Sequence, residues 1–114
     1  MKTNLEFYHE FIDYFVNLRD SINIRRIENN SLHQFDSDTN QFISSLNTTQ
    51  KKQLISLLQS ERDNALHSVL VFFNEELNNE MKILQKSNEL PLEPYGTELF
   101  YDFVCRLNGD EWPK

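Results

Sequence analysis

The segment ERDNALHSVLVFFNEELN, residues 61–78, joins a charged stretch to one of the most apolar runs of the chain. Its apolar spacing predicts a helix over residues 49–79, about 30 residues and roughly 45 Å long, which is either continuous or bent near Ser60. Residues 69–73 are apolar on every side, and a helix that is apolar all round is buried all round. We therefore expect a central helix whose inward face comprises Leu54, Ile55, Leu58, Ala65, Val69, Phe72 and Phe73.

Two shorter helices are predicted before this one. Residues 3–20 carry apolar side chains at helical spacing, and Thr3 with Glu6 forms a capping box. Residues 23–36 are polar and predict a loop with room for a short helical turn. Ser37 is the expected N-cap of the second helix, whose inward residues would be Phe42, Ile43 and Leu46.

The C-terminal part predicts a hairpin and a last helix. The apolar segments Ile83-Leu84 and Leu90–Leu92 flank residues 86–89, and Ser87-Asn88 is suited to a turn, so a short β-hairpin is expected there. The last helix would start at Thr97 and end near Leu107, with Asn108-Gly109 stopping it. Its inward residues would be Leu99, Phe100, Phe103, Val104 and Leu107. The fold class is therefore mainly α: a four-helix-type single domain over residues 1–114, with a long central helix and a hairpin before the last helix.

The composition indicates the kind of fold that the chain can form and the cellular compartment that suits it. A chain of 114 residues with 39% apolar residues and nine Phe can build one core without disulfides. The single Cys105 indicates a reducing compartment. We expect no signal peptide, and no apolar run approaches the ~18 residues of a membrane span, which together predict a cytoplasmic protein.

The net charge of −7 points to a kind of partner. Half of the 18 acidic residues lie between Glu75 and Glu111, where only Lys82, Lys86 and Arg106 oppose them. Such a surface repels phosphate backbones, which argues against a nucleic-acid partner, and it favours association with a basic protein. Homo-oligomerisation through exposed Phe or Trp is a further alternative.

Arg62 stands out because helical spacing places it in the apolar stripe with Leu58 and Val69. A buried charge is costly unless it is paired or reaches water. We predict an ion pair between helices, with Glu93, Glu98 or Asp102 as the partner carboxylate. The functional alternative is a ligand carboxylate or phosphate held by the guanidinium.

Asp63 and His67 are four residues apart and share a helix face. The favoured interpretation is a structural contact in which the carboxylate orients the imidazole. The alternative is a general base with its orienter, or two metal ligands completed by Glu98 or Asp102. This spacing is not specific, and HExxH, nucleophile-elbow and Gly-rich phosphate motifs are absent, so we expect no cofactor.

Trp112, beside Pro113, predicts a tail that folds back onto the core past the last helix, or an exposed anchor for a partner. Arg106 is expected to pair with Asp102, four residues back. A single groove would then be lined by Arg62, Asp63, His67, Glu98, Asp102 and Trp112.

A family resemblance covers roughly residues 48–113. It rests on Glu61, Arg62, Asp63, His67, Leu90-Pro91, Glu93-Pro94, Gly96-Thr97-Glu98, Asp102, Val104-Cys105-Arg106, Gly109-Asp110 and Trp112-Pro113. This pattern resembles a family of small acidic bacterial proteins known only as a domain of unknown function, and the resemblance implies no activity. The leading hypothesis is a non-enzymatic cytoplasmic interaction or regulatory protein of adaptor or immunity type. The alternative is a small metal-binding or hydrolytic module using Asp63 and His67 with a carboxylate from the last helix.

Overall fold

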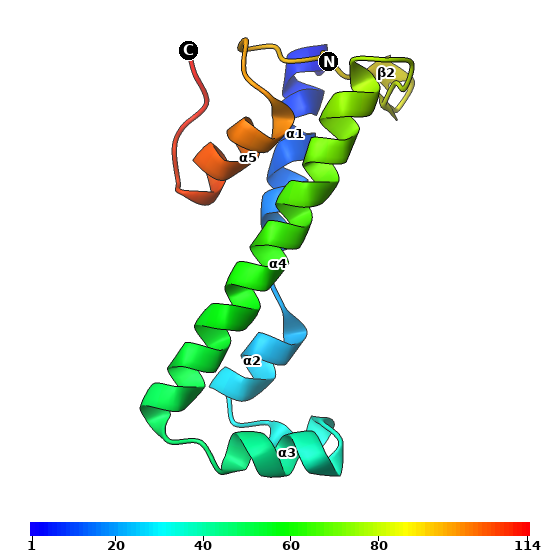
Figure 1. Ribbon diagram of the computed structural model, residues 1–114. Coiled ribbons are helices and arrows are strands. Elements are labelled where there is room, and N and C mark those ends of the chain that lie inside the picture. The colour runs from blue at the N-terminus through cyan, green and yellow to red at the C-terminus, as the bar shows by residue number, and fades with distance from the viewer. The chain divides into compact units, whose positions relative to one another are not determined.

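The computed structural model describes residues 1–114 and is mainly helical, with one short hairpin (Figure 1). In chain order the elements are α1 (Asn4–Asn17), α2 (Ile22–Glu28), the 3₁₀ turn η1 (Leu32–Gln34), α3 (Ser37–Ser44), α4 (Thr48–Leu77), β1 (Leu84–Gln85), β2 (Asn88–Glu89) and α5 (Leu99–Leu107). The predicted fold class, the long helix and the hairpin before the last helix are confirmed. Helix α2 occupies part of the segment for which a loop with a short helical turn was predicted.

The chain divides into two compact units. Unit 1 comprises Met1–Leu18 and Asn64–Lys114, and unit 2 comprises Arg19–Asp63. Helix α4 passes through the boundary, so its first part belongs to unit 2 and its second part to unit 1. That residues 1–114 form a single domain stays a prediction, because a division into two compact units does not test it.

The core of unit 1 is built by three helices that lie side by side in Figure 1: α1, α5 and the C-terminal part of α4. Its fully buried side chains are Tyr8, Ile12, Leu70, Leu99 and Phe103. The indole of Trp112 packs against this cluster, which confirms that the tail folds back past the last helix.

The core of unit 2 is smaller. Its buried residues are Ile27, Leu32 and Ile43, with Phe35, Leu54 and Ile55 packed around them. Phe42 was predicted to face inward and is exposed, so that part of the prediction is wrong. The N-cap of α3 is Asp36 rather than Ser37, because the Asp36 carboxylate accepts a hydrogen bond from the Thr39 N–H at 2.8 Å.

Helix α4 is continuous, and its start is capped by reciprocal hydrogen bonds between Asn47 and Gln50. The prediction that residues 69–73 are buried all round is wrong. Val69 is 42% exposed and Phe72 is 52% exposed, whereas Leu70 and Asn74 are buried. The buried positions of α4 in unit 1 thus form one stripe, beside which Leu66, Phe73 and Leu77 are partly buried against the core. Val69 and Phe72 lie outside this stripe and are open to solvent.

Helix α5 begins differently from the prediction. Its N-cap is Glu98, not Thr97, and the orphan N–H of Leu99 donates to Oδ1 of Asn74 on α4 at 2.8 Å. The end of α5 is as predicted, because Gly109 takes a positive φ of 86°. The Asp110 N–H then donates to the Cys105 carbonyl at 3.0 Å, as in a Schellman motif.

The hairpin pairs Leu84 with Glu89 and Gln85 with Asn88. Its turn residues are Lys86 and Ser87, with φ of 50° and 67°, one position earlier than the predicted Ser87-Asn88. Two positive φ values at the centre of a two-residue loop mark a type I′ turn, whose twist matches that of the flanking strands.

Candidate functional site

Asp102 of α5 is a buried carboxylate of unit 1, at 6% exposure. Its Oδ2 accepts a hydrogen bond from the Tyr8 hydroxyl of α1 at 2.5 Å, and its Oδ1 accepts one from the Thr97 hydroxyl at 2.5 Å. A buried carboxylate is tolerated only when donors of this kind satisfy it. Burial, reinforced by the hydrogen bond to Asp102, raises the pKa of Tyr8.

Arg106 pairs with Asp13 on α1, so the predicted Arg106–Asp102 contact is wrong. The guanidinium binds in bidentate fashion, with Nε to Oδ1 at 2.8 Å and Nη2 to Oδ2 at 3.1 Å. Its Nη1 donates to the Asp110 carbonyl at 2.7 Å, which attaches the tail to α5. The hydrogen bond to Asp13 raises the pKa of Arg106.

His9 of α1 lies against the tail. Its ring stacks on the indole of Trp112, with centroids 4.1 Å apart and an angle of 8° between the planes. His9 Nε2 and the Tyr95 hydroxyl share a hydrogen bond. Loss of hydration lowers the pKa of His9, while the nearby Asp13 acts in the opposite direction.

A cavity of about 280 Å³, which we call the tail pocket, opens beside the contacts made by Asp102, Arg106 and His9. Its lining residues are Tyr95, Thr97, Tyr101, Asp102, Cys105, Arg106, Asp110, Glu111, Trp112 and Pro113. The structure therefore brings together two of the six predicted site residues, Asp102 and Trp112. Val104, predicted to be buried, is 39% exposed.

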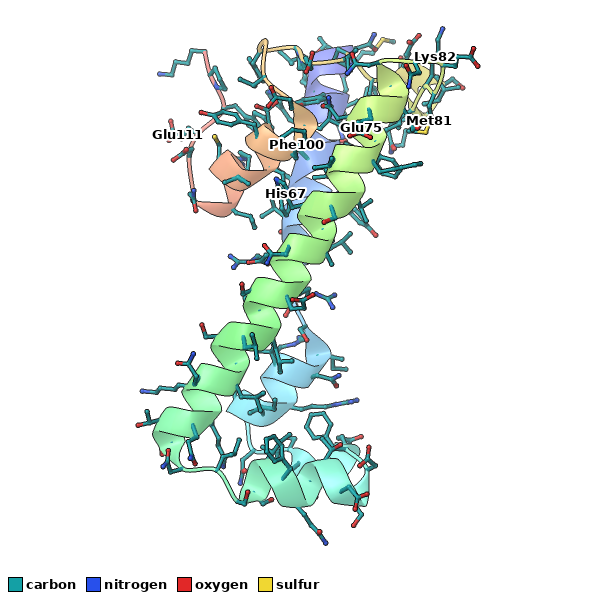
Figure 2. The ribbon with its side chains drawn as sticks, in the orientation of Figure 1. His67, Glu75, Met81, Lys82, Phe100 and Glu111 are labelled. Carbon is teal, nitrogen blue, oxygen red and sulfur yellow. The ribbon has the colours of Figure 1, made fainter.

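His67 and Glu98 belong to the same unit but do not line the tail pocket. The His67 ring meets the ring of Phe100 edge-on, with centroids 5.2 Å apart, and Figure 2 shows both side chains between α4 and α5. Glu98 is the N-cap of α5 and makes no side-chain capping bond. His67 therefore packs against an aromatic ring, and Glu98 lies at a helix terminus.

Arg62 and Asp63 belong to unit 2. The Asp63 carboxylate accepts hydrogen bonds from Arg19 Nη2 at 2.9 Å, Arg19 Nε at 3.3 Å and Gln59 Nε2 at 3.0 Å. A contact between Asp63 and His67 was predicted, but Asp63 is bound by Arg19 and Gln59, and His67 packs against Phe100. Arg62 is exposed, because the α4 face on which it lies is open rather than buried.

The hydrogen-bonded network beside the tail pocket includes three α1 residues that were not predicted from the sequence: Tyr8, His9 and Asp13. One local signal existed, since His9 and Asp13 are four apart and share a face, the same spacing that singled out Asp63 and His67. Their partners Asp102, Tyr95 and Arg106 lie at least 86 residues further along the chain.

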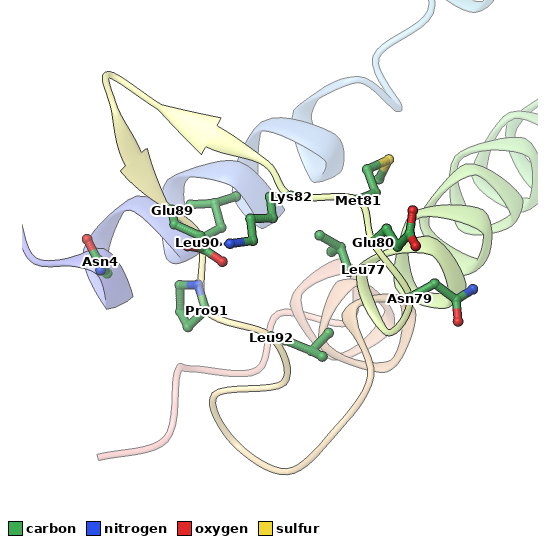
Figure 3. Close-up of a pocket in the computed structure, with 10 residues that line it drawn as sticks. All are labelled: Asn4, Leu77, Asn79, Glu80, Met81, Lys82, Glu89, Leu90, Pro91 and Leu92. Atoms are coloured by element: carbon green, nitrogen blue, oxygen red, sulfur yellow. Dashed lines mark ion pairs between the residues drawn. The ribbon is translucent and has the colours of Figure 1, made fainter.

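A second cavity, of about 290 Å³, lies between the end of α4 and the hairpin (Figure 3). Lys82 and Glu89 form an ion pair at its edge, with Nζ and Oε2 3.8 Å apart, and Leu77 and Leu90 contribute apolar surface. The chain contains no group of three or more His, Cys, Asp or Glu side chains that could hold a metal ion.

The charge is divided unequally between the units. Unit 1 holds 12 acidic residues against five basic ones, a net charge of −7, whereas unit 2 holds six of each. The five cations of unit 1 are Lys2, Lys82, Lys86, Arg106 and Lys114. The whole net charge of the chain therefore belongs to the unit that carries both cavities.

None of the helices combines the length and the hydropathy that crossing a bilayer requires. No curated protein and no solved structure matches the chain significantly. A family model does match, and it covers residues 1–114, so the likeness extends to the first 45 residues, where the sequence had suggested none. The chain belongs to the family of unknown function DUF6547.

Proposed function

We propose that this protein is a non-enzymatic interaction protein, of regulatory or immunity type, whose acidic unit 1 binds a basic protein. The observation that carries the proposal is the concentration of the entire net charge of −7 in unit 1. A surface with one sign of charge attracts partners of the opposite sign and raises their association rate. A single cysteine, which cannot form an internal disulfide, supports a reducing, cytoplasmic setting for this interaction.

Little of this charge is neutralised within unit 1. Three of its cations already form ion pairs: Lys2 with Glu10, Lys82 with Glu89, and Arg106 with Asp13. Asp102 is buried and bound by hydroxyl groups. Eight other carboxylates of unit 1 form no ion pair: Glu6, Glu75, Glu76, Glu80, Glu93, Glu98, Asp110 and Glu111.

Two variants with matched charge test the proposal. The first removes three exposed charges of unit 1, by Glu75→Gln, Glu80→Gln and Glu111→Gln. The second removes three from unit 2, by Glu28→Gln, Asp38→Asn and Glu61→Gln. A basic protein should co-purify from host cells at low salt, and its affinity for each purified variant is then measured by calorimetry.

We expect the unit 1 variant to bind the isolated partner roughly tenfold more weakly at low salt, and the unit 2 variant to bind it almost as the wild type does. The difference should disappear at high salt, where surface charges are screened. Equal effects of the two variants, or binding indifferent to salt, would contradict the proposal.

A further inference from the structure

An aromatic groove lies beside α1. It has a volume of about 440 Å³ and is lined by Glu10, Phe11, Tyr14 and Phe15 of α1 and by Gln85 of β1. Three of its five lining residues are aromatic, and Tyr14 is 64% exposed. Exposed aromatic surface of this kind is typical of protein interaction sites.

The aromatic surface continues onto α4. The Phe73 ring lies 6.5 Å from that of Phe11 and 6.2 Å from that of Phe15, so it packs against two of the rings that line the groove. The ring of its neighbour Phe72 is 6.0 Å from Phe73 and 52% exposed. This open apolar face is the one that the sequence predicted to be covered.

An exposed carboxylate follows Phe72 on α4. Glu75 lies one turn beyond Phe72 on α4, is exposed and forms no ion pair, and its side chain is labelled in Figure 2. A second copy of the chain would bring another unit of net charge −7 against the first, which opposes self-association. A partner with positive charge beside its apolar side chains meets no such repulsion.

We infer that the aromatic groove, together with Phe72, receives the apolar side chains of a basic amphipathic segment of a partner protein. The inference rests on the proposed function and adds to it the place and the chemistry of contact. Apolar anchors fill the groove, and lysine or arginine residues beside them meet the acidic surface of unit 1. A helix that lays its apolar face in a hydrophobic groove is a common mode of peptide recognition.

The test uses a fluorescent amphipathic helical peptide made of leucine and lysine, with a serine–lysine peptide of the same charge as its comparator. Binding is measured by fluorescence anisotropy at low and high salt. The groove variants are Tyr14→Ser and Phe72→Ser, and the matched control is Phe42→Ser, which removes an equally exposed phenylalanine from neutral unit 2.

We expect each groove variant to bind the leucine–lysine peptide about tenfold more weakly, the loss typical of an aromatic anchor, and the control to bind as the wild type does. The serine–lysine peptide should bind all four proteins weakly and equally. Circular dichroism checks folding, and Tyr14→Ser decides alone if Phe72→Ser does not fold.

Three outcomes would overturn the inference, and they separate it from the proposed function. Salt-sensitive binding of the leucine–lysine peptide that the groove variants leave unchanged would remove the groove and leave the charge-based function standing. The absence of any salt-sensitive binding would count against both. A dimer of the wild type that Tyr14→Ser dissociates, seen by analytical ultracentrifugation, would make a second copy the occupant.

Discussion

The carboxylate of Asp102 shows how a single residue joins the two ends of unit 1. It is held by the hydroxyl groups of Tyr8 on α1 and of Thr97 just before α5, and no cation contacts it. Removing one donor would leave a buried carboxylate oxygen without a partner, which costs far more than the net value of one hydrogen bond.

We therefore expect Tyr8→Phe to lower the free energy of unfolding by about 1–3 kcal/mol, measured by urea denaturation. The matched control is Tyr14→Phe, which removes the hydroxyl of a mostly exposed tyrosine and should change stability by less than about 0.5 kcal/mol. Equal losses in the two variants would show that the Tyr8–Asp102 hydrogen bond does not stabilise the fold.

The lowered pKa of His9 predicts that the stability of unit 1 depends on pH. This pKa is lowered in the folded chain, chiefly by loss of hydration, so the unfolded chain binds the proton more readily. The stabilisation is fully present above the unfolded pKa of about 6.5 and is lost as pH falls from there through the lowered folded value. The pKa of His9 is raised by the nearby carboxylates of Asp13, Glu6 and Asp102, which makes the net lowering smaller. It is lowered further by the positive charge of Arg106.

We expect the free energy of unfolding to decline between about pH 7 and pH 5, and the decline to be shallower in His9→Gln. The fluorescence of Trp112, the only tryptophan, gives a local measure because its indole stacks on the His9 ring. His33→Gln, at an exposed histidine of unit 2, is the control and should retain the wild-type slope. The same slope in His9→Gln and the wild type would exclude His9 as the group responsible.

At the scale of elements, α5 depends on α4 for its N-terminal cap. Glu98 offers no side-chain capping bond, and the Leu99 N–H is satisfied by the buried amide of Asn74. Asn74→Leu keeps the approximate size and removes this acceptor, so we expect a loss of about 1–3 kcal/mol in the free energy of unfolding. Chemical denaturation followed by circular dichroism measures it.

The control for this prediction is Asn64→Leu, an exposed asparagine on the same helix. It should change stability by less than about 0.5 kcal/mol, as surface substitutions usually do. A tolerated Asn74→Leu would mean that the N-terminus of α5 finds another acceptor, such as water.

The elements also show where the helical pattern was informative and where it was not. The capping box of Thr3 and Glu6 and the stop at Gly109 were predicted, because caps depend on residues within one helical turn. The buried face of α4 was not, because apolar residues occupy every side at 69–73 and the periodicity cannot select among them. The buried face of α4 is the one that carries Leu70, because α1 and α5 pack against this residue.

At the scale of the whole molecule, the unequal charge should make the two units respond differently to salt. Carboxylates of unit 1 repel one another, and screening this repulsion favours the folded state. Unit 2 has six charges of each sign and no such net repulsion.

We expect an increase in sodium chloride from about 0.02 M to about 0.5 M to slow amide exchange in unit 1 by a factor on the order of three, about 0.6 kcal/mol, and to leave unit 2 nearly unchanged. Hydrogen exchange followed by mass spectrometry resolves the two units as separate peptides. A parallel series in sucrose, which favours compact states without screening charge, controls for general stabilisation. Equal slowing of both units by salt would argue against self-repulsion as the cause.

The helical class, the long α4, the hairpin, several helix ends and the net charge could all be predicted from the sequence, because each depends on composition or on neighbours a few residues apart. The pairing of Asp102 with Tyr8 and of Arg106 with Asp13 could not be predicted and depends on the folded arrangement of the helices, since these partners are 94 and 93 residues apart along the chain. The tertiary structure also decided which apolar side chains stay open to solvent, because burial depends on what packs against a helix face and not on the face alone.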